Sequence, residues 1–400
     1  MENTKKIYIS DSYALNTGDL GILFATLKEL EVAFPNSDLS IESSHPNFLK
    51  QYKEVSGYLL FPRIFDIHLL VGSNSRVKIL AIVKGLTDST LFLFWAILQR
   101  IGINTLSVLP KSRRRQALAL LEADIILSSG GGFLSSYYNY QFRIQLYLIS
   151  FLLKKKVVIF AQSVGPFKTL ISKIIVPLFL KKMSLITIRE EDSYEYLKST
   201  CPGIQVELVA DIAFLLNINS KIESTYERLL KEKNVAFCIK NTSNIEYFTS
   251  IYSSAKKLND LGYNCFFVSQ TPNDDEICIK FAHKLNTQRN YILFGTSPSD
   301  LKSIYSRCDF IIASRMHAII FAVAENIPFI CLAYEPKFKG LLSQLRYPME
   351  FLIPELQVKQ LPSRLESFLP QLDKLQSDIK LNIERIHTLS SRSINLLKQL

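Results

Sequence analysis

The feature that most constrains the fold of this chain is a repeated alternation between short apolar runs, rich in β-branched residues, and longer amphipathic stretches. This alternation is typical of βα units built on a parallel sheet. In the first half we expect strands at Lys6–Ser10, Asp38–Glu42, Asp124–Ser128, Val157–Ala161 and Leu185–Ile188. A second series follows the polar stretch Asn217–Tyr226, with strands expected at Val235–Lys240, Cys265–Ser269, Tyr291–Phe294, Phe310–Ala313 and Phe329–Ala333.

Two successive series of similar length predict an α/β protein with two Rossmann-like domains, each with a parallel sheet, and a cleft between the domains. We expect the first domain over residues 1–217, the second over 218–370, and a helix over 371–400. Apolar residues recur every three or four positions in this last segment, which favours a helix that packs back across the domains. A coiled coil or a membrane-surface helix are the alternatives. Residues 52–110 are expected to hold further βα material without assignable boundaries.

Composition narrows the class of protein and of partner. Of the 400 residues, 48% are hydrophobic and 21% charged, which indicates a folded globular protein and excludes a disordered one. Lys and Arg number 47 against 36 Asp and Glu, a net charge of +11 that favours anionic partners. The runs Arg113–Arg115 and Lys154–Lys156 fit solvated helix ends or a patch facing anionic lipid, and no basic motif interleaved with aromatics supports nucleic-acid binding.

Neither a signal peptide nor a membrane-spanning window is recognisable. Met1–Lys6 leads straight into a strand-like run, and the most apolar window, Leu91–Leu98, is too short to cross a bilayer. We therefore expect a cytoplasmic protein, and the basic, apolar character leaves open a peripheral contact with the inner membrane face. The six scattered cysteines have no metal-ligand spacing and are interpreted as buried thiols.

Polar clusters follow six of the predicted strands. In an open parallel sheet, ligands bind beyond the carboxyl ends of the strands, so these clusters predict a site. The residues of interest in the first half are Asn16, Gly18, Asp19, Gly130, Gly131, Gly132, Gln162, Gly165, Arg189 and, near the domain junction, Asp211. In the second half they are Ser314, Arg315, His317, Tyr334 and Lys337.

Each cluster has a structural interpretation beside the functional one. Gly130–Gly132 can supply a tight turn or a loop whose N–H groups approach an anion, and it matches neither standard phosphate-binding glycine motif. Asn16 and Asp19 can be helix caps, and Asp211 a turn former. Arg189 and Arg315 lie directly after strands, where a guanidinium can bind carboxylate or phosphate through two hydrogen bonds or form an interdomain salt bridge. His317 begins a helix two residues later, which favours an acid–base role over a structural one.

Taken in order, these motifs resemble the polysaccharide pyruvyl transferase family. The resemblance rests on Asn16-x-Gly18-Asp19, Ser129-Gly-Gly-Gly132, Gln162-Ser-Val-Gly165-Pro166, Arg189-x-x-x-Ser193, Ala210-Asp211 and Ser314-Arg315-Met-His317, and continues through Ile327-Pro328 to Tyr334 and Lys337. It covers residues 10 to about 345. It implies a two-domain fold similar to that of the GT-B glycosyltransferases. It also implies transfer of pyruvate from phosphoenolpyruvate onto two hydroxyls of a sugar in a surface polysaccharide or its lipid-linked precursor, with release of phosphate.

By this resemblance Arg189, Arg315 and His317 bind phosphoenolpyruvate, and His317 is the catalytic acid. The donor is a substrate, and neither a cofactor nor a metal is expected, because the arginines already supply positive charge. Two other functions stay open. One is a GT-B glycosyltransferase that uses a nucleotide sugar. Retaining GT-B enzymes often carry two glutamates separated by seven residues, whereas Glu325 and Glu335 are separated by nine, which disfavours this function. The other is a non-catalytic glycan- or anion-binding protein. The acceptor sugar and self-association are left open.

Overall fold

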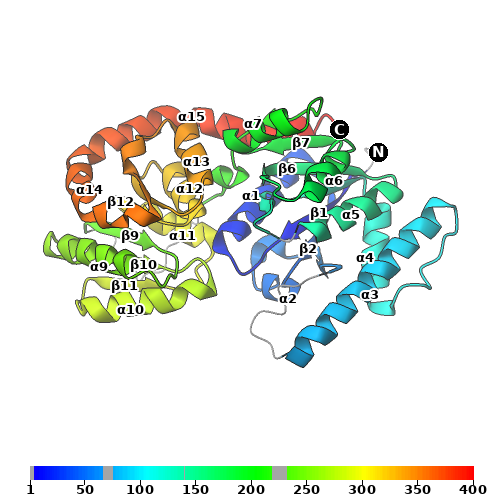
Figure 1. The fold of residues 1–400 in the computed structure, drawn as a ribbon, viewed down its shortest axis with the longest axis horizontal. Helices are drawn as coiled ribbons and strands as arrows, with labels where there is room; N and C mark the ends of the chain where they lie inside the picture. The colour runs from blue at the N-terminus through cyan, green and yellow to red at the C-terminus, as the bar shows by residue number, and fades with distance from the viewer. Residues whose placement is uncertain (1–3, 66–74, 139, 219–231) are drawn as a thin grey trace. The chain divides into compact units, whose positions relative to one another are not determined.

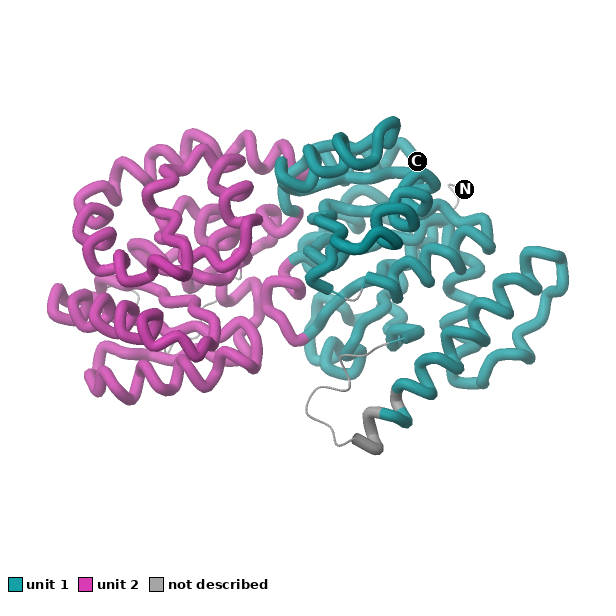
Figure 2. Tube along the Cα trace, viewed as in Figure 1, with its two compact units in different colours: residues 1–14, 22–211, 392–400 teal, residues 15–21, 212–391 magenta. Residues whose placement is uncertain are grey.

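The computed structural model describes all residues except 1–3, 66–74, 139 and 219–231 (Figure 1). The described chain forms two compact units, each built on a parallel sheet (Figure 2). Unit 1 contains residues 1–14, 22–211 and 392–400, and unit 2 contains residues 15–21 and 212–391. The division differs in detail from a single boundary after residue 217, because the short segment 15–21 groups with unit 2 and the last nine residues group with unit 1.

The sheet of unit 1 has the strand order β3-β2-β1-β4-β6-β7-β8, and β5 pairs with β6. All these pairs are parallel. The strands are β1 (Lys6–Ser12), β2 (Asp38–Ser43), β3 (Leu59–Pro62), β4 (Ile125–Ser128), β5 (Gly131–Leu134), β6 (Lys156–Val164), β7 (Leu185–Ile188) and β8 (Glu207–Leu208). The helices are α1 (Thr17–Ala33), α2 (Pro46–Leu49), α3 (Ser75–Arg100), α4 (Lys111–Glu122), α5 (Gln141–Leu152), α6 (Leu170–Leu180) and α7 (Glu191–Thr200).

The sheet of unit 2 is also parallel, in the order β11-β10-β9-β12-β13-β14. Its strands are β9 (Asn234–Cys238), β10 (Asn264–Val268), β11 (Asn290–Leu293), β12 (Phe310–Ala313), β13 (Phe329–Ala333) and β14 (Leu352–Pro354). Its helices are α9 (Ile245–Asp260), α10 (Asp275–Leu285), α11 (Pro298–Tyr305), α12 (Met316–Ala324), α13 (Lys337–Leu345), α14 (Leu361–Phe368) and α15 (Leu372–Leu397).

The central strands are apolar and buried along their whole length, as parallel strands covered on both faces must be. All four residues of β4 and of β12 are buried, and so are all five of β9 and of β10. Each of the ten strands expected from the sequence overlaps an observed strand, so the prediction of two parallel-sheet α/β units is confirmed. The unassigned region 52–110 holds β3 and the 26-residue helix α3.

The expected helix over 371–400 is α15, which buries Leu375, Ile379, Ile383, Ile386 and Leu397. Residues up to 391 group with unit 2, and the remainder groups with unit 1, where Arg392 pairs with Glu207. The six cysteines are free and buried, as the sequence predicts. No helix in the described part of the chain combines the length and the apolar content that crossing a membrane requires.

Candidate functional site

The polar clusters of unit 2 gather at one edge of its sheet. Strands β10, β9, β12 and β13 are neighbours and run parallel, so their carboxyl ends lie side by side. Ala313, the last residue of β12, is in register with Cys238 of β9 and Cys331 of β13. The residues that follow these strands therefore line a common edge: Thr271–Asp274, Lys240, Ser314–His317 and Tyr334–Lys337. This is the edge at which open parallel sheets bind ligands.

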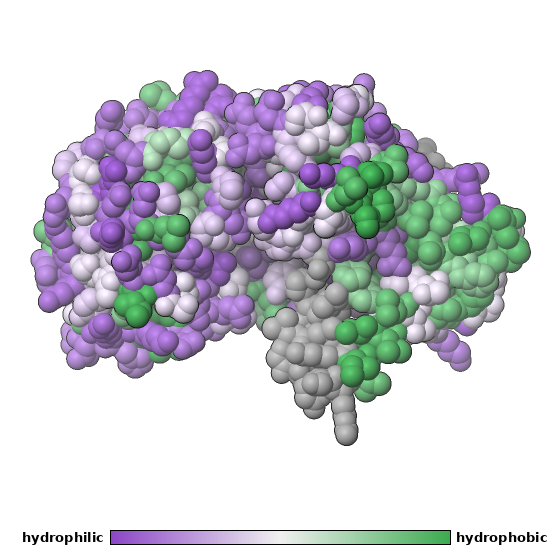
Figure 3. All heavy atoms as spheres, in the orientation of Figure 1, coloured by the Kyte–Doolittle hydropathy of each residue, from purple (hydrophilic) through white to green (hydrophobic). Residues whose placement is uncertain are grey.

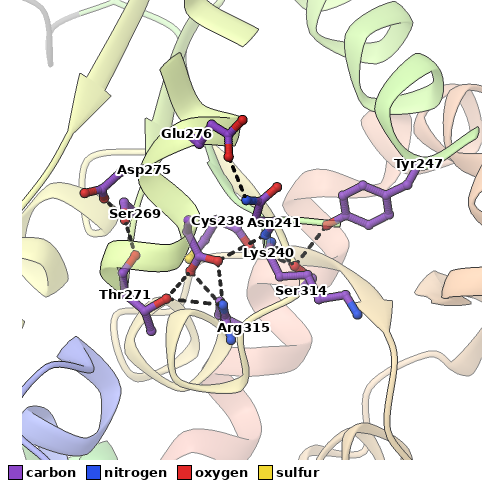
Figure 4. Close-up of polar contacts among 11 residues, drawn as sticks. Cys238, Lys240, Asn241, Tyr247, Ser269, Thr271, Asp275, Glu276, Ser314 and Arg315 are labelled. Atoms are coloured by element: carbon purple, nitrogen blue, oxygen red, sulfur yellow. Dashed lines mark hydrogen bonds and ion pairs between the residues drawn. The ribbon is translucent and has the colours of Figure 1, made fainter. Parts of the chain in front are cut away.

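Arg315, labelled in Figure 4, is held at this edge by Asp274, a residue that the sequence analysis did not single out. Its Nε lies 3.0 Å from Oδ2 of Asp274, and its Nη2 lies 2.5 Å from Oδ1 of the same residue. Burial lowers the pKa of Arg315, but the attraction of Asp274 outweighs this effect and the net pKa is raised. The guanidinium is therefore a permanent cation of fixed orientation. Among the contacts of the described residues, its Nη1 donates no hydrogen bond.

Asp274 is fully buried, and its carboxylate accepts hydrogen bonds from Arg315 and from the neighbouring loops. Its side chain is 0% exposed, and besides the guanidinium it accepts hydrogen bonds from Thr271 Oγ1 at 3.0 Å and from the Asn241 amide at 3.1 Å. A carboxylate that accepts hydrogen bonds from this many donors orients its partner rigidly. Asp274 therefore acts as the residue that positions Arg315.

Ser314 ties the loop after β12 to the loop after β9. It is fully buried; its Oγ accepts a hydrogen bond from the Lys240 amide at 2.8 Å and another from the Tyr247 hydroxyl at 3.0 Å (Figure 4). The Ser314 hydroxyl is thus hydrogen-bonded to other residues of the protein. These hydrogen bonds fix the distance between the two loops.

Tyr334 and Lys337, both predicted site residues, lie together with Lys240. The ring of Tyr334 has the Nζ of Lys240 at 4.2 Å and the Nζ of Lys337 at 5.8 Å from its centre. Each ammonium group also pairs with a carboxylate: Lys240 with Glu355 at 2.8 Å, and Lys337 with Glu335 at 2.7 Å. About a fifth of each lysine side chain is exposed (21% and 20%), so both cations can be reached from solvent.

His317 is the second residue of α12, and its ring lies against the first turn of α1. A Cβ placed on Gly18 would come within 2.3 Å of His317 Nδ1, so only glycine leaves room for the imidazole. The turn is held by Asn16, whose Oδ1 accepts from the Gly18 amide at 2.8 Å, and by Thr17, whose amide donates to the Gln270 carbonyl at 3.0 Å. Asn16 therefore performs the helix-capping role that the sequence offered, and Asp19 lies in the same turn. The structure brings Asn16, Gly18 and His317 together within unit 2.

The remaining predicted residues belong to unit 1. Arg189, which follows β7, is 3% exposed; its Nη1 donates to Asp211 Oδ2 at 2.5 Å and its Nε to Ser163 Oγ at 3.0 Å. A second carboxylate, Glu190, lies 3.6 Å from Nε. The Arg189 guanidinium is therefore engaged in an ion pair inside unit 1, and Asp211 is its partner as well as a residue of the predicted site.

Gln162 and the glycines form the carboxyl edge of the same sheet. Gln162 is fully buried, and its Nε2 donates to the Ser129 carbonyl at 2.6 Å, which ties β6 to the loop after β4. Gly131 has a φ of 136° and Gly165 a φ of 80°, conformations that favour glycine. The Tyr196 ring covers Gly165 at 2.3 Å from the place of a Cβ. Gly130 and Gly132 are the neighbours of Gly131 in the chain. A Cβ placed on Gly132 would lie 4.0 Å from Nη2 of Arg189.

A buried ion pair between Asp11 and Arg143 lies in unit 1 and was not predicted from the sequence. Asp11, with a φ of 68°, forms an ion pair with Arg143, whose Nε lies 2.8 Å from Asp11 Oδ1. Its Oδ2 accepts a hydrogen bond from Ser128 Oγ at 2.6 Å. Burial lowers the pKa of Arg143, although the charge of Asp11 opposes this. The signal was an acidic residue directly after the first predicted strand. No group of three or more His, Cys, Asp or Glu side chains within the described ranges is placed to hold a metal ion.

The resemblance to known proteins is consistent with this geometry. A model of the polysaccharide pyruvyl transferase family matches residues 16–336. The amylovoran biosynthesis protein AmsJ of Erwinia amylovora is 20% identical over 405 residues, which cover 94% of this chain and 95% of that protein.

Solved structures with this fold include MnaA from S. aureus with UDP, at a TM-score of 0.64 and 13% identity over 99% of this chain and 96% of that one. They also include Anabaena Alr3699/HepE in complex with UDP-glucose, at a TM-score of 0.59 and 10% identity over 98% of each chain. At such identity these likenesses show the fold alone, two parallel-sheet α/β domains as in the GT-B glycosyltransferases and epimerases. With most of its length matched by the family model, the chain belongs to the polysaccharide pyruvyl transferase family and is an enzyme of that class.

Proposed function

We propose that the enzyme takes its pyruvyl group from phosphoenolpyruvate and attaches it to two hydroxyls of one sugar as a cyclic ketal. A glycan acceptor follows from the family, and the amylovoran biosynthesis relative supports a polysaccharide as the source of that sugar. We propose that the acceptor is a surface polysaccharide or its lipid-linked precursor. The observation that carries the choice of donor is the cation cluster at the edge of unit 2. Arg315, Lys240 and Lys337 all lie at the carboxyl ends of neighbouring strands.

Phosphoenolpyruvate presents a carboxylate and a phosphate on a three-carbon frame, so it needs several cations close together. Arg315 offers its Nη1, which donates no hydrogen bond to any residue that the structure describes. Asp274 already holds the guanidinium in place, which spares the cost of ordering it when the donor binds. The two lysines that flank Tyr334 can exchange their carboxylate partners for phosphate oxygens. Arg189 stays a predicted donor ligand, and binding there would require its ion pair with Asp211 to open.

The proposed reaction needs one proton at carbon and two deprotonated hydroxyls. An acid, His317 in our proposal, gives a proton to the methylene carbon while the first acceptor oxygen bonds to the carbon that bears the phosphate ester. The carbon–oxygen bond to phosphate then breaks, and the second hydroxyl oxygen closes the ketal. Of the two hydroxyl protons, one restores the acid and the other leaves with inorganic phosphate, so the balance needs no further reactant.

Titration calorimetry of the full chain with phosphoenolpyruvate and, separately, with UDP-glucose tests the choice of donor. We expect heat of binding with phosphoenolpyruvate and none with UDP-glucose; the reverse result would support the glycosyltransferase alternative. Arg315→Lys should weaken phosphoenolpyruvate binding about tenfold or more, because an ammonium group cannot make the paired hydrogen bonds of an oriented guanidinium. The matched control is Arg307→Lys on the exposed surface of the same unit, which should bind as the wild type does.

The ketal is tested by incubating the enzyme and phosphoenolpyruvate with a panel of galactosides, mannosides, glucosides and amino sugars. Release of inorganic phosphate together with the mass gain of one pyruvate ketal on an acceptor is the expected result. Phosphate release without that gain would mean hydrolysis of the donor and would refute the transfer.

A further inference from the structure

Unit 1 exposes a large set of apolar side chains on two of its helices. On α6 these are Leu170, Ile171, Ile174, Ile175 and Leu178, and on α3 they are Ile79, Leu80, Ile82, Val83, Leu86, Phe94 and Ile97. Figure 3 shows green areas in the part of the visible face where Figure 1 draws α3 and α6. We call these twelve residues the apolar face. Exposed apolar side chains gathered in this way on a folded unit mark an interaction site.

Helix α6 is apolar on nearly every side although only one narrow stripe of it is buried. Ser172, Val176 and Leu180, spaced four residues apart, pack into unit 1. The five apolar residues of α6 in the apolar face are 40% to 75% exposed. A helix that is hydrophobic all round is normally buried, so this composition indicates that something other than water covers its outer side.

Helix α3 repeats the pattern at greater length. Its second half packs through Phe92, Trp95 and Ala96, which are fully buried, whereas Ile79, Leu80, Val83 and Leu86 in its first half are 55% to 69% exposed. Helix α5 lies between α3 and α6 and packs against both, so the three helices form one layer of unit 1. The exposed side chains of α3 and α6 therefore belong to one layer.

The same part of the chain carries the positive charge of the protein. Residues 75–182 contain sixteen Lys and Arg and three Asp and Glu, a net charge of +13, which exceeds the +11 of the whole chain. Helices α5 and α6 contain no acidic residue, and the only one in α3 is Asp88, which is buried in an ion pair with Arg113. Exposed cations border the apolar face, among them Lys84, Arg100, Lys168, Lys173, Lys181 and Lys182.

From this combination we infer that the apolar face binds the surface of an acidic lipid bilayer. Apolar side chains of a helix lying in the interface reach the acyl boundary, while lysines extend their ammonium groups to anionic headgroups. Association with a second copy through this face would bring two positively charged surfaces together, which like-charge repulsion opposes. A bilayer supplies both the apolar medium and the negative charge. The inference concerns unit 1 alone and does not depend on the identity of the donor.

Co-sedimentation of the full chain with lipid vesicles tests the inference without any substrate. We expect binding to vesicles of phosphatidylglycerol and phosphatidylcholine, much weaker binding to phosphatidylcholine alone, and loss of binding at high salt. Ile174→Glu should lower vesicle affinity roughly tenfold, since it puts a charge of the wrong sign into the face. Lys173→Gln should lower it on the order of fivefold.

Matched controls lie on α15 in unit 2. Leu381 is 81% exposed, so Leu381→Glu makes the same change of charge and hydropathy as Ile174→Glu, and Lys380→Gln matches Lys173→Gln. Neither control should alter vesicle binding. If Ile174→Glu and Leu381→Glu lowered vesicle affinity equally, the loss would come from the change in net charge alone, and the proposal would be overturned. A change of oligomeric state in Ile174→Glu without a change in vesicle binding would assign the face to a second copy and also overturn it.

A second measurement reports contact with lipid directly. All six native cysteines are buried, so a cysteine introduced at Leu178 can be labelled selectively with a polarity-sensitive dye. We expect the fluorescence of L178C to rise and shift to the blue on addition of acidic vesicles, and that of L381C to stay unchanged. An unchanged spectrum for both would overturn the proposal even if the protein sedimented with vesicles.

Discussion

Replacing Asp274 by asparagine should damage unit 2 and donor binding together. The fully buried carboxylate accepts two hydrogen bonds from Arg315, one from Thr271 and one from the Asn241 amide. In Asp274→Asn the charge is gone, and one oxygen becomes an NH2 group that cannot accept from any of these donors. Breaking a buried ion pair costs about 3–5 kcal/mol when one partner is deleted; because the amide keeps half of the acceptors, we expect about 3 kcal/mol.

Urea denaturation followed by circular dichroism measures this loss. Trp95, the only tryptophan, lies in unit 1, so its fluorescence follows that unit separately. In the same variant, phosphoenolpyruvate affinity should fall at least tenfold, because Arg315 is no longer held. The control is Glu276→Gln two residues away, whose exposed carboxylate pairs with Lys280 and should leave both measurements unchanged. A wild-type denaturation midpoint for Asp274→Asn would refute the positioning role that we give to this residue.

Three further predictions concern other parts of the chain. Gly18→Ala should abolish turnover while the fold persists, because the new methyl group would lie 2.3 Å from His317 Nδ1 and force the ring to move; full activity would show that this contact is dispensable. His317→Ala should lower turnover by roughly 10²–10⁴ with phosphoenolpyruvate affinity retained, as measured by phosphate release and calorimetry; equal losses in both would make it a binding residue instead. Burial raises the pKa of Glu42 from 4.5 to about 7, so native unit 1 binds more protons than the unfolded chain between these values. Its stability should therefore fall by roughly 3 kcal/mol as pH rises through that window, and Glu42→Gln should flatten this fall in urea titrations followed by Trp95 fluorescence. An identical fall in the variant would place its origin elsewhere.

The sheets could be predicted because the strands that form them are buried on both faces and read as unbroken apolar runs. β4, β9 and β12 are examples in which every residue is buried. Helix α3 could not be delimited, since Ile79, Leu80, Ile82, Val83 and Leu86 in its first half are exposed and do not recur with a period that points to a core. Burial inside unit 1 does not explain these exposed apolar residues, so a pattern that reports internal burial could not mark where the helix begins.

Residues of the candidate site could be predicted where a polar or charged side chain directly follows a strand. Ser314, Arg315 and Tyr334 were identified in this way because parallel register brings the ends of β12 and β13 to one edge. Asp274 was not identified, since it lies six residues beyond the end of β10 and, beside Asp275, reads as an ordinary acidic helix start. Lys240 was taken as the last residue of a strand that in fact ends at Cys238. The pairing of Arg189 with Asp211 joins residues 22 positions apart, which no local pattern encodes.

The grouping of residues 15–21 with unit 2 has a consequence for any attempt to divide this enzyme. Those seven residues supply the backbone against which two rings of α12 rest: Gly18 for His317 and Gly21 for Phe321. A fragment that starts at residue 212 would lack the backbone that covers the rings of His317 and Phe321. Recombinant expression of the C-terminal half should therefore yield a poorly soluble product, unless the missing heptapeptide is restored by fusion or supplied in trans.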